Sequence, residues 1–260
     1  MLSYQHAYHA GNAADVHKHA LLSWALAYLA QKEKPLTYIE THAGRGLYDL
    51  AAPEAAKTGE AAGGIVRALA EGWFPPGHPY LAALARVRAA HGPTAYPGSP
   101  LLAAELLRPE DRMVLAELHP QEHAALTHAM RHRYTVIHKT DGLNLALAVT
   151  PPEPRRGLML IDPPYEVKSD YEAVARVVPQ VHAKWNVGVV MIWYPILATG
   201  AHLDMAGALE TAGLARPFRH EVRFAPAKAG HGMIGSGLYV VNAPFGMGDE
   251  AGRIAKRFAP

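Results

Sequence analysis

The stretch Leu158-Met159-Leu160-Ile161-Asp162-Pro163-Pro164-Tyr165 decides both the fold and the chemistry expected of this chain. Its apolar half predicts a buried strand, which ends at a carboxylate followed by two prolines. Asp162 can accept a hydrogen bond from an exocyclic amine, and the carbonyl of Pro163 is free to accept from the same amine. Tyr165 offers a ring on which a planar base can stack. The stretch therefore predicts a holder for the amino group of a nucleobase.

Length and composition limit the classes of protein to be considered. The chain has 260 residues, half of them hydrophobic, which suits one α/β domain over residues 1–260. It has no cysteine, so disulfides and thiolate metal sites are excluded, and a reducing cytoplasm is expected. A formal net charge of +2 argues against a protein that coats nucleic acid along its length, but it permits a local basic face. The apolar segment 20–30 is too short to span a bilayer, so we expect no membrane partner.

Apolar strands alternate with helical patterns along most of the chain. Strands are expected near 36–40, 113–117, 134–138, 158–161 and 187–193. This alternation predicts a mostly parallel sheet with helices on both faces. Segments 220–224 and 237–242 are expected to add an antiparallel pair at the C-terminal end. Residues 50–97 are rich in Ala, Gly and Pro, show no strand pattern, and are expected to form a small helical insertion.

Acidic residues close four successive strands of the expected sheet, at Glu40, Glu117, Asp141 and Asp162. Since ligands of open parallel sheets bind at the carboxyl ends of the strands, these side chains should share one site. Glu117 can accept from ribose hydroxyls, and Asp141 with Gly142 suits an adenine amino group. Several carboxylates without a phosphate-binding loop favour a cationic ligand. S-adenosylmethionine fits, because it carries a sulfonium, an ammonium, a ribose diol and an adenine amine.

Other conspicuous residues leave alternatives open. His6, His9 and His17 are expected to be polar surface or RNA-facing residues, and their spacing does not favour a metal site. Trp193 and Tyr194 could wall the base pocket or belong to the core. Basic residues could bind phosphate or be solvated. These are Arg86, Arg88, Arg216, Arg219 and Arg223.

Several longer motifs resemble one family, the bacterial 23S rRNA adenine-N6 methyltransferases of the RlmJ type. The motifs follow in the same order along nearly the whole chain. They are residues 2–19, Thr41-His42-Ala43-Gly44, Tyr96-Pro97-Gly98-Ser99-Pro100, Glu117-Leu118-His119-Pro120, residues 156–166, Trp193-Tyr194-Pro195, and Gly232-Met233 with residues 237–244.

The resemblance implies a Rossmann-like class I methyltransferase that uses S-adenosylmethionine on one adenosine of 23S rRNA. The cofactor contacts would be Lys18, His19, His42, Ser99, Glu117, Asp141, Gly142 and Asp162. The catalytic residues would be Asp162, Pro163 and Tyr165, and the substrate contacts Tyr4, Pro164 and Tyr165. Separately from the resemblance, we expect a cytoplasmic monomer without a bound metal.

The D-P-P-Y motif by itself leaves other activities open. A DNA adenine-N6 or an rRNA guanine-N2 methyltransferase would also need to hold a conjugated exocyclic amine. A nicotinamide-dependent dehydrogenase is disfavoured, since Asp49 stands where the dinucleotide fingerprint begun by Gly44 and Gly46 requires a third glycine. A non-catalytic RNA-binding module would not need the intact strand-end carboxylates.

Overall fold

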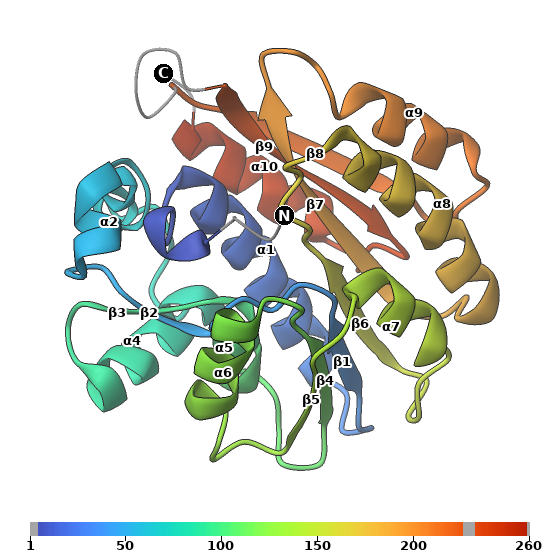
Figure 1. Cartoon of the computed structure of the whole chain (residues 1–260), viewed down its shortest axis with the longest axis horizontal. Helices are drawn as coiled ribbons and strands as arrows, with labels where there is room; N and C mark the ends of the chain where they lie inside the picture. Colours follow the sequence, from blue (N-terminus) through green and yellow to red (C-terminus); the bar gives the residue numbers. More distant parts are fainter. Residues whose placement is uncertain (1–4, 226–231, 259–260) are drawn as a thin grey trace.

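The computed structural model describes residues 5–225 and 232–258. Its centre is a seven-stranded sheet with the strand order β5-β4-β1-β6-β7-β9-β8 (Figure 1). The strands of this sheet are β1 (Thr37–Glu40), β4 (Arg112–Ala116), β5 (Thr135–His138), β6 (Gly157–Ile161), β7 (Val189–Leu197), β8 (Phe218–Arg223) and β9 (Met233–Val241).

Most of the sheet is parallel, as the alternating pattern predicts. β1 pairs in parallel with β4 on one side and with β6 on the other. β9 runs antiparallel to both β7 and β8, so the expected antiparallel pair is present. The predicted fold class, a mostly parallel Rossmann-like sheet with an antiparallel C-terminal strand, is confirmed.

Helices cover both faces of the sheet, because neighbouring strand residues point to opposite sides. In β6, Leu158 and Leu160 pack into one core, whereas Met159 and Ile161 pack into the other. The first core contains side chains of α1 (Ala13–Ala30), α5 (Ser99–Ala104), α6 (Pro120–Ala129) and α10 (Met247–Phe258). The second contains side chains of α7 (Gly142–Ala148), α8 (Lys168–Lys184) and α9 (Leu203–Thr211).

The insertion at 50–97 is helical for most of its length, but it also contains a strand that the sequence did not predict. Its helices are α2 (Pro53–Thr58), η2 (Glu60–Gly63), α3 (Ile65–Ala70) and α4 (Pro79–His91). β3 (Ala95–Pro97) pairs antiparallel with β2 (Leu47–Asp49). Strands this short show too few alternations for a period-2 pattern, which is why the expectation of a strandless insertion was wrong.

Two further segments differ from or extend the prediction. Asp141, expected from the sequence only as the acidic end of a strand, is the N-cap of α7, because its Oδ1 accepts from the backbone N–H of Asn144 at 2.8 Å. The C-terminal tail, for which the sequence predicted no element, forms α10 and buries Ile254 and Phe258.

Gly157 lies at the centre of the sheet, where only glycine fits. A Cβ at this position would lie 2.0 Å from the carbonyl oxygen of Thr37 on β1. We expect Gly157→Ala to lower the free energy of unfolding by at least about 2 kcal/mol, since backbone atoms cannot move aside as a side chain does. Gly207→Ala in α9 is the control, because a Cβ there meets no atom within 4 Å, and it should stabilise by about 0.5–1 kcal/mol. Urea unfolding compares the two, and equal effects would contradict the prediction.

Candidate active site

One cavity of about 620 Å³ opens at the carboxyl ends of the parallel strands, where the acidic residues were expected to meet. The first turns of α1 and the D-P-P-Y turn after β6 also line it. Apart from Tyr4, which lies outside the described residues, every predicted site residue lines this cavity. These are Lys18, His19, His42, Ser99, Glu117, Asp141, Gly142, Asp162, Pro163, Pro164 and Tyr165.

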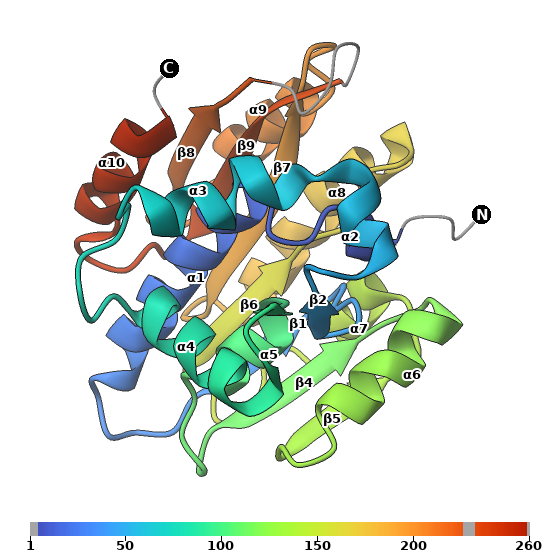
Figure 2. The same ribbon diagram turned by 90° about the vertical axis from the view of Figure 1, so that its left-hand side faces the viewer.

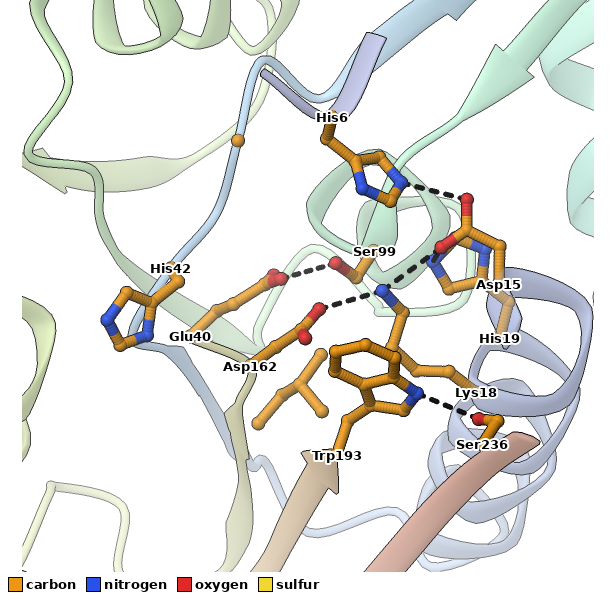
Figure 3. A network of polar contacts seen from close by, with 12 residues as sticks. His6, Asp15, Lys18, His19, Glu40, His42, Ser99, Asp162, Trp193 and Ser236 are labelled. Atoms are coloured by element: carbon orange, nitrogen blue, oxygen red, sulfur yellow. Dashed lines mark hydrogen bonds and ion pairs between the residues drawn. The ribbon is translucent and has the colours of Figure 1, made fainter. Parts of the chain in front are cut away.

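A buried lysine joins α1 to the end of β6 (Figure 3). Nζ of Lys18 lies 2.7 Å from Oδ2 of Asp162 and 3.1 Å from Oδ1 of Asp15. Burial alone would lower the pKa of Lys18, but the two carboxylates outweigh it and hold that pKa above its usual range. Lys18 is therefore a permanent cation that fixes one oxygen of Asp162.

Asp15 and His6 belong to this network, although Asp15 was not among the predicted site residues and His6 was expected only as a polar surface or RNA-facing residue. Asp15 is 1% exposed, and its Oδ2 contacts Nε2 of His6 at 2.9 Å and the N–H of Gly11 at 2.9 Å. Burial would raise the pKa of Asp15, but the charges of His6 and Lys18 hold it well below its usual value. The available signal was the i, i+3 spacing of Asp15 and Lys18 on one helix face.

His17 and His19 point in different directions, as two positions on a helix require. Nδ1 of His19 hydrogen-bonds the Tyr96 hydroxyl at 2.9 Å, and burial lowers the pKa of His19 to about 3, so the ring is neutral. His17 is fully buried and lies away from the cavity, so the expectation of a surface or RNA-facing residue was wrong. The sequence pattern could not show that β8 and β9 cover this face of α1.

His17 instead forms part of a polar chain behind the aromatic wall of the cavity. The indole N–H of Trp193 donates to Oγ of Ser236 at 2.8 Å, and Ser236 contacts Nδ1 of His17 at 2.9 Å. Nε2 of His17 lies 2.9 Å from Nδ1 of His220. Since an indole can only donate, a chain running from Trp193 through Ser236 and His17 to His220 gives each of these three contacts one donor and one acceptor. The chain fixes the orientation of the Trp193 ring, which Lys18 approaches at 5.4 Å.

A second buried carboxyl, Glu40, lies beside the ion pair without lining the cavity. Its Oε1 accepts from the Ser99 hydroxyl, and its Oε2 accepts from the Tyr38 hydroxyl at 2.8 Å. Burial raises the pKa of Glu40 to about 8, although these two hydrogen bonds work in the opposite direction. Glu40 therefore links β1 to the start of α5 rather than facing a ligand directly.

The remaining acids shape the far end of the cavity. Oε2 of Glu117 accepts from the N–H of Gly44 and Oε1 from the N–H of His119, both at 2.8 Å. Burial raises the pKa of Glu117 above its usual value despite these hydrogen bonds. A Cβ on Gly142 would lie 1.8 Å from the carbonyl oxygen of Thr41, so this glycine permits close packing of α7 against the turn after β1.

Within the D-P-P-Y turn, Pro164 is exposed but Tyr165 is 6% exposed. Tyr165 has a φ of +51°, and its hydroxyl donates to the carbonyl of Trp193 at 2.8 Å. Its ring centroid lies 4.4 Å from that of Tyr171, which covers one side. Trp193 is half-buried and lines the cavity, whereas Tyr194 is fully buried in the core.

The basic residues named as possible phosphate contacts do not all have free side chains. Arg86 pairs with Glu105 at 2.8 Å, and Arg219 pairs with Glu210 at 2.9 Å.

Among the residues that the structure describes, no group of three or more His, Cys, Asp or Glu could hold a metal ion. No helix within residues 5–225 and 232–258 is both long and apolar enough to cross a membrane.

Comparison with known proteins agrees with this fold. A family model described as ribosomal RNA large subunit methyltransferase D, RlmJ, matches residues 33–259. Ribosomal RNA large subunit methyltransferase J of Escherichia coli is 37% identical over 247 residues, which cover 94% of this chain and 88% of the relative. The protein of that name from Haemophilus influenzae is 38% identical over 248 residues, with the same coverage. The crystal structure of protein LPL1258 from Legionella pneumophila superposes with a TM-score of 0.85 at 32% identity, covering 96% of this chain and 92% of that one.

The fold, the acid-lined cavity at the strand ends and the relatives named as methyltransferases together define an α/β methyltransferase, an enzyme that transfers a methyl group. The length and sequence identity of these matches also identify the family within this class. The chain belongs to the RlmJ family.

Glu40 gives the site a pH dependence that stability measurements can detect. In the unfolded chain its carboxyl titrates near pH 4.3, whereas its folded pKa is raised to about 8. A raised pKa means that the folded state binds the extra proton, so this contribution is complete below pH 4 and is lost as the pH rises toward 8. Glu40→Gln has no proton to lose, so its free energy of unfolding relative to the wild type should rise between pH 5 and 8, by at most about 1.4 kcal/mol per pH unit. A difference that stays constant with pH in urea unfolding would contradict this prediction.

Proposed function

We propose that this protein transfers the methyl group of S-adenosylmethionine to the N6 amine of an adenosine in 23S rRNA. The observation that carries the proposal is the carboxylate of Asp162, which opens into the cavity while Lys18 holds one of its oxygens. The match to proteins named as methyltransferases of large-subunit ribosomal RNA supports the choice of polymer. An enzyme acting on ribosomal RNA would work in the cytoplasm.

The cavity fits S-adenosylmethionine in charge and size. Its volume of about 620 Å³ is that of a typical site for a small ligand. Glu117 holds one backbone N–H with each oxygen, and its remaining lone pairs can accept from ribose hydroxyls. Asp141 uses Oδ1 to cap α7, so Oδ2 is available for an adenine amine. When bound, the cofactor would supply an electrophilic methyl group on a sulfonium cation, which an acid-lined cavity stabilises.

Asp162 would hold the target amine in a reactive geometry. Lys18 occupies Oδ2, so we assign Oδ1 and the Pro163 carbonyl as acceptors from the two N6–H groups. These hydrogen bonds favour a pyramidal nitrogen, whose lone pair is then directed at the methyl group instead of into the ring. Holding the reacting atoms in line supplies much of the rate. The amine gains the methyl carbon as the bond between that carbon and the sulfonium sulfur breaks, and the nitrogen loses one proton to solvent.

The target base must be flipped out of its helix and held by a flat surface. We assign Pro164 and Tyr165 to this contact, with Tyr4 added from the N-terminal segment. Because Tyr171 covers one side of Tyr165, the half-buried ring of Trp193 supplies the more open aromatic surface. Tyr165 then acts mainly by fixing the Trp193 backbone and the end of the motif.

Methylation of total rRNA with labelled S-adenosylmethionine tests the proposed function. We expect label in 23S rRNA, and digestion to nucleosides should place it on N6-methyladenosine at one position. Label on guanine, on small-subunit RNA or only on DNA would assign a different activity. Calorimetry with S-adenosylmethionine serves as a control, because a non-catalytic RNA-binding module would show no saturable heat.

Asp162→Ala should separate catalysis from folding. We expect single-turnover methyl transfer to fall about 100- to 1,000-fold, which is typical when a preorganised polar group is removed. Folding should persist, since Lys18 keeps its ion pair with Asp15. Asp204→Ala is the matched control, because Asp204 is an exposed carboxylate on α9 that does not line the cavity. Undiminished transfer by Asp162→Ala would rule out the assigned role.

A further inference from the structure

The helical insertion contacts the N-terminal loop, which we define as residues 9–12 between η1 (His6–Tyr8) and α1. Oε1 of Glu60 lies 3.0 Å from Nδ1 of His9, and Oε2 accepts from Nδ2 of Asn12 at 3.0 Å. The N–H of Ile65 donates to the carbonyl of Gly11 at 2.8 Å. Figure 2 shows α2 and α3 of the insertion beside this loop and the start of α1.

The backbones of the insertion and the loop also touch directly. A Cβ on Gly64 would lie 2.1 Å from the carbonyl oxygen of Gly11 and 2.4 Å from the carbonyl carbon of Asn12. Any residue other than glycine would force the two segments apart, since these neighbours are backbone atoms. Gly63 differs, because a Cβ there meets no atom within 4 Å.

Successive polar contacts connect the insertion, through the N-terminal loop, to the carboxylate of Asp162. Oδ1 of Asn12 accepts from the N–H of Asp15 at 2.9 Å, and the N–H of Gly11 donates to Oδ2 of Asp15 at 2.9 Å. Asp15 then pairs with Lys18 at 3.1 Å, and Lys18 pairs with Asp162 at 2.7 Å. Asn12 is 7% exposed, and the side chains of Glu60, Asp15 and Lys18 are at most 6% exposed, so few of these groups can exchange a partner for water.

Glu60 itself is unsuited to bind RNA. Its side chain is a carboxyl group that is only 6% exposed, and both of its oxygens contact the N-terminal loop. Phosphates would repel such a group, whereas the loop supplies donors for both oxygens. The loop has no regular structure of its own and therefore needs support from outside.

We propose that the insertion positions the active site: Glu60 and Gly64 hold the N-terminal loop so that Asp15 and Lys18 keep Asp162 aligned. Glu60 is thus a positioning residue that acts through the loop and does not touch substrate. The inference rests on the proposed function where it concerns methyl transfer. The contacts between the insertion and the N-terminal loop do not depend on that function, because they belong to the folded chain.

Two matched pairs of variants test the proposal. Glu60→Ala is compared with Glu71→Ala, which removes an exposed carboxylate of the same insertion that pairs with Arg67. Gly64→Ala is compared with Gly63→Ala. Hydrogen exchange of the amides of residues 6–12 is measured together with single-turnover methyl transfer. We expect Glu60→Ala and Gly64→Ala to exchange at least about tenfold faster in this segment and to transfer methyl about tenfold more slowly. The two controls should match the wild type, and the amides of β6 should stay protected in all four variants.

A double-mutant cycle separates positioning from general destabilisation. If Glu60 acts through Lys18, then adding Glu60→Ala to Lys18→Ala should change methyl transfer less than twofold. A tenfold loss in both backgrounds would overturn the proposal, as would wild-type exchange of residues 6–12 in both Glu60→Ala and Gly64→Ala. Should Glu60→Ala fail to fold, the Gly64→Ala and Gly63→Ala pair decides by the same readouts.

Failure of the proposed function would look different. In that case the wild type would not methylate adenosine in 23S rRNA, yet the exchange of residues 6–12 would still rise in Glu60→Ala and Gly64→Ala. Normal wild-type methylation with unchanged exchange in these variants would contradict the positioning role alone.

Discussion

The structure depends on one buried cation, Lys18, placed between two carboxylates. Burying a charge is costly unless it is paired, and here the pairs join α1 to the end of β6. Separating the N-terminal helix from the sheet would break the pair between Lys18 and Asp162, whereas Asp15 and Lys18 would stay together on the helix. The same contact holds the carboxylate of Asp162 at the mouth of the cavity. Stability and chemistry thus share one interaction.

The groups around this cation are of two kinds: some fix the surrounding structure, and others face the cavity and can bind a ligand. Glu40 and Ser99 connect β1 to α5 from behind, and Ser236 with His17 fixes the aromatic wall. Glu117 and Asp141 face the cavity with lone pairs that the backbone leaves unused. The insertion supports the N-terminal loop from outside. A rigid frame of this kind suits a reaction whose rate depends on alignment.

Much of the fold could be predicted from local hydrophobic patterns. Much of the site could then be predicted from the fold, because the ends of parallel strands meet at one edge of the sheet. The apolar run of β6 and the acids at the strand ends predicted the sheet, the cavity and most of its lining. The sequence could not predict pairings between distant segments, such as Lys18 with Asp162, 144 residues apart, or His17 with Ser236, 219 residues apart. The burial of Tyr165 was missed for the same reason, since Tyr171 and Trp193 reach it only in the folded chain.

The central claim is that Lys18 is needed because it neutralises Asp15 beside Asp162. The free energy of unfolding in urea, compared between Lys18→Met and the double variant Lys18→Met/Asp15→Asn, tests this most directly. Lys18→Met should lose about 3–5 kcal/mol, since it leaves buried carboxylates without their cation. The added Asp15→Asn should recover a large part of that loss by removing the unpaired charge. A Lys18→Met protein as stable as the wild type, or a double variant no more stable than Lys18→Met, would contradict the account.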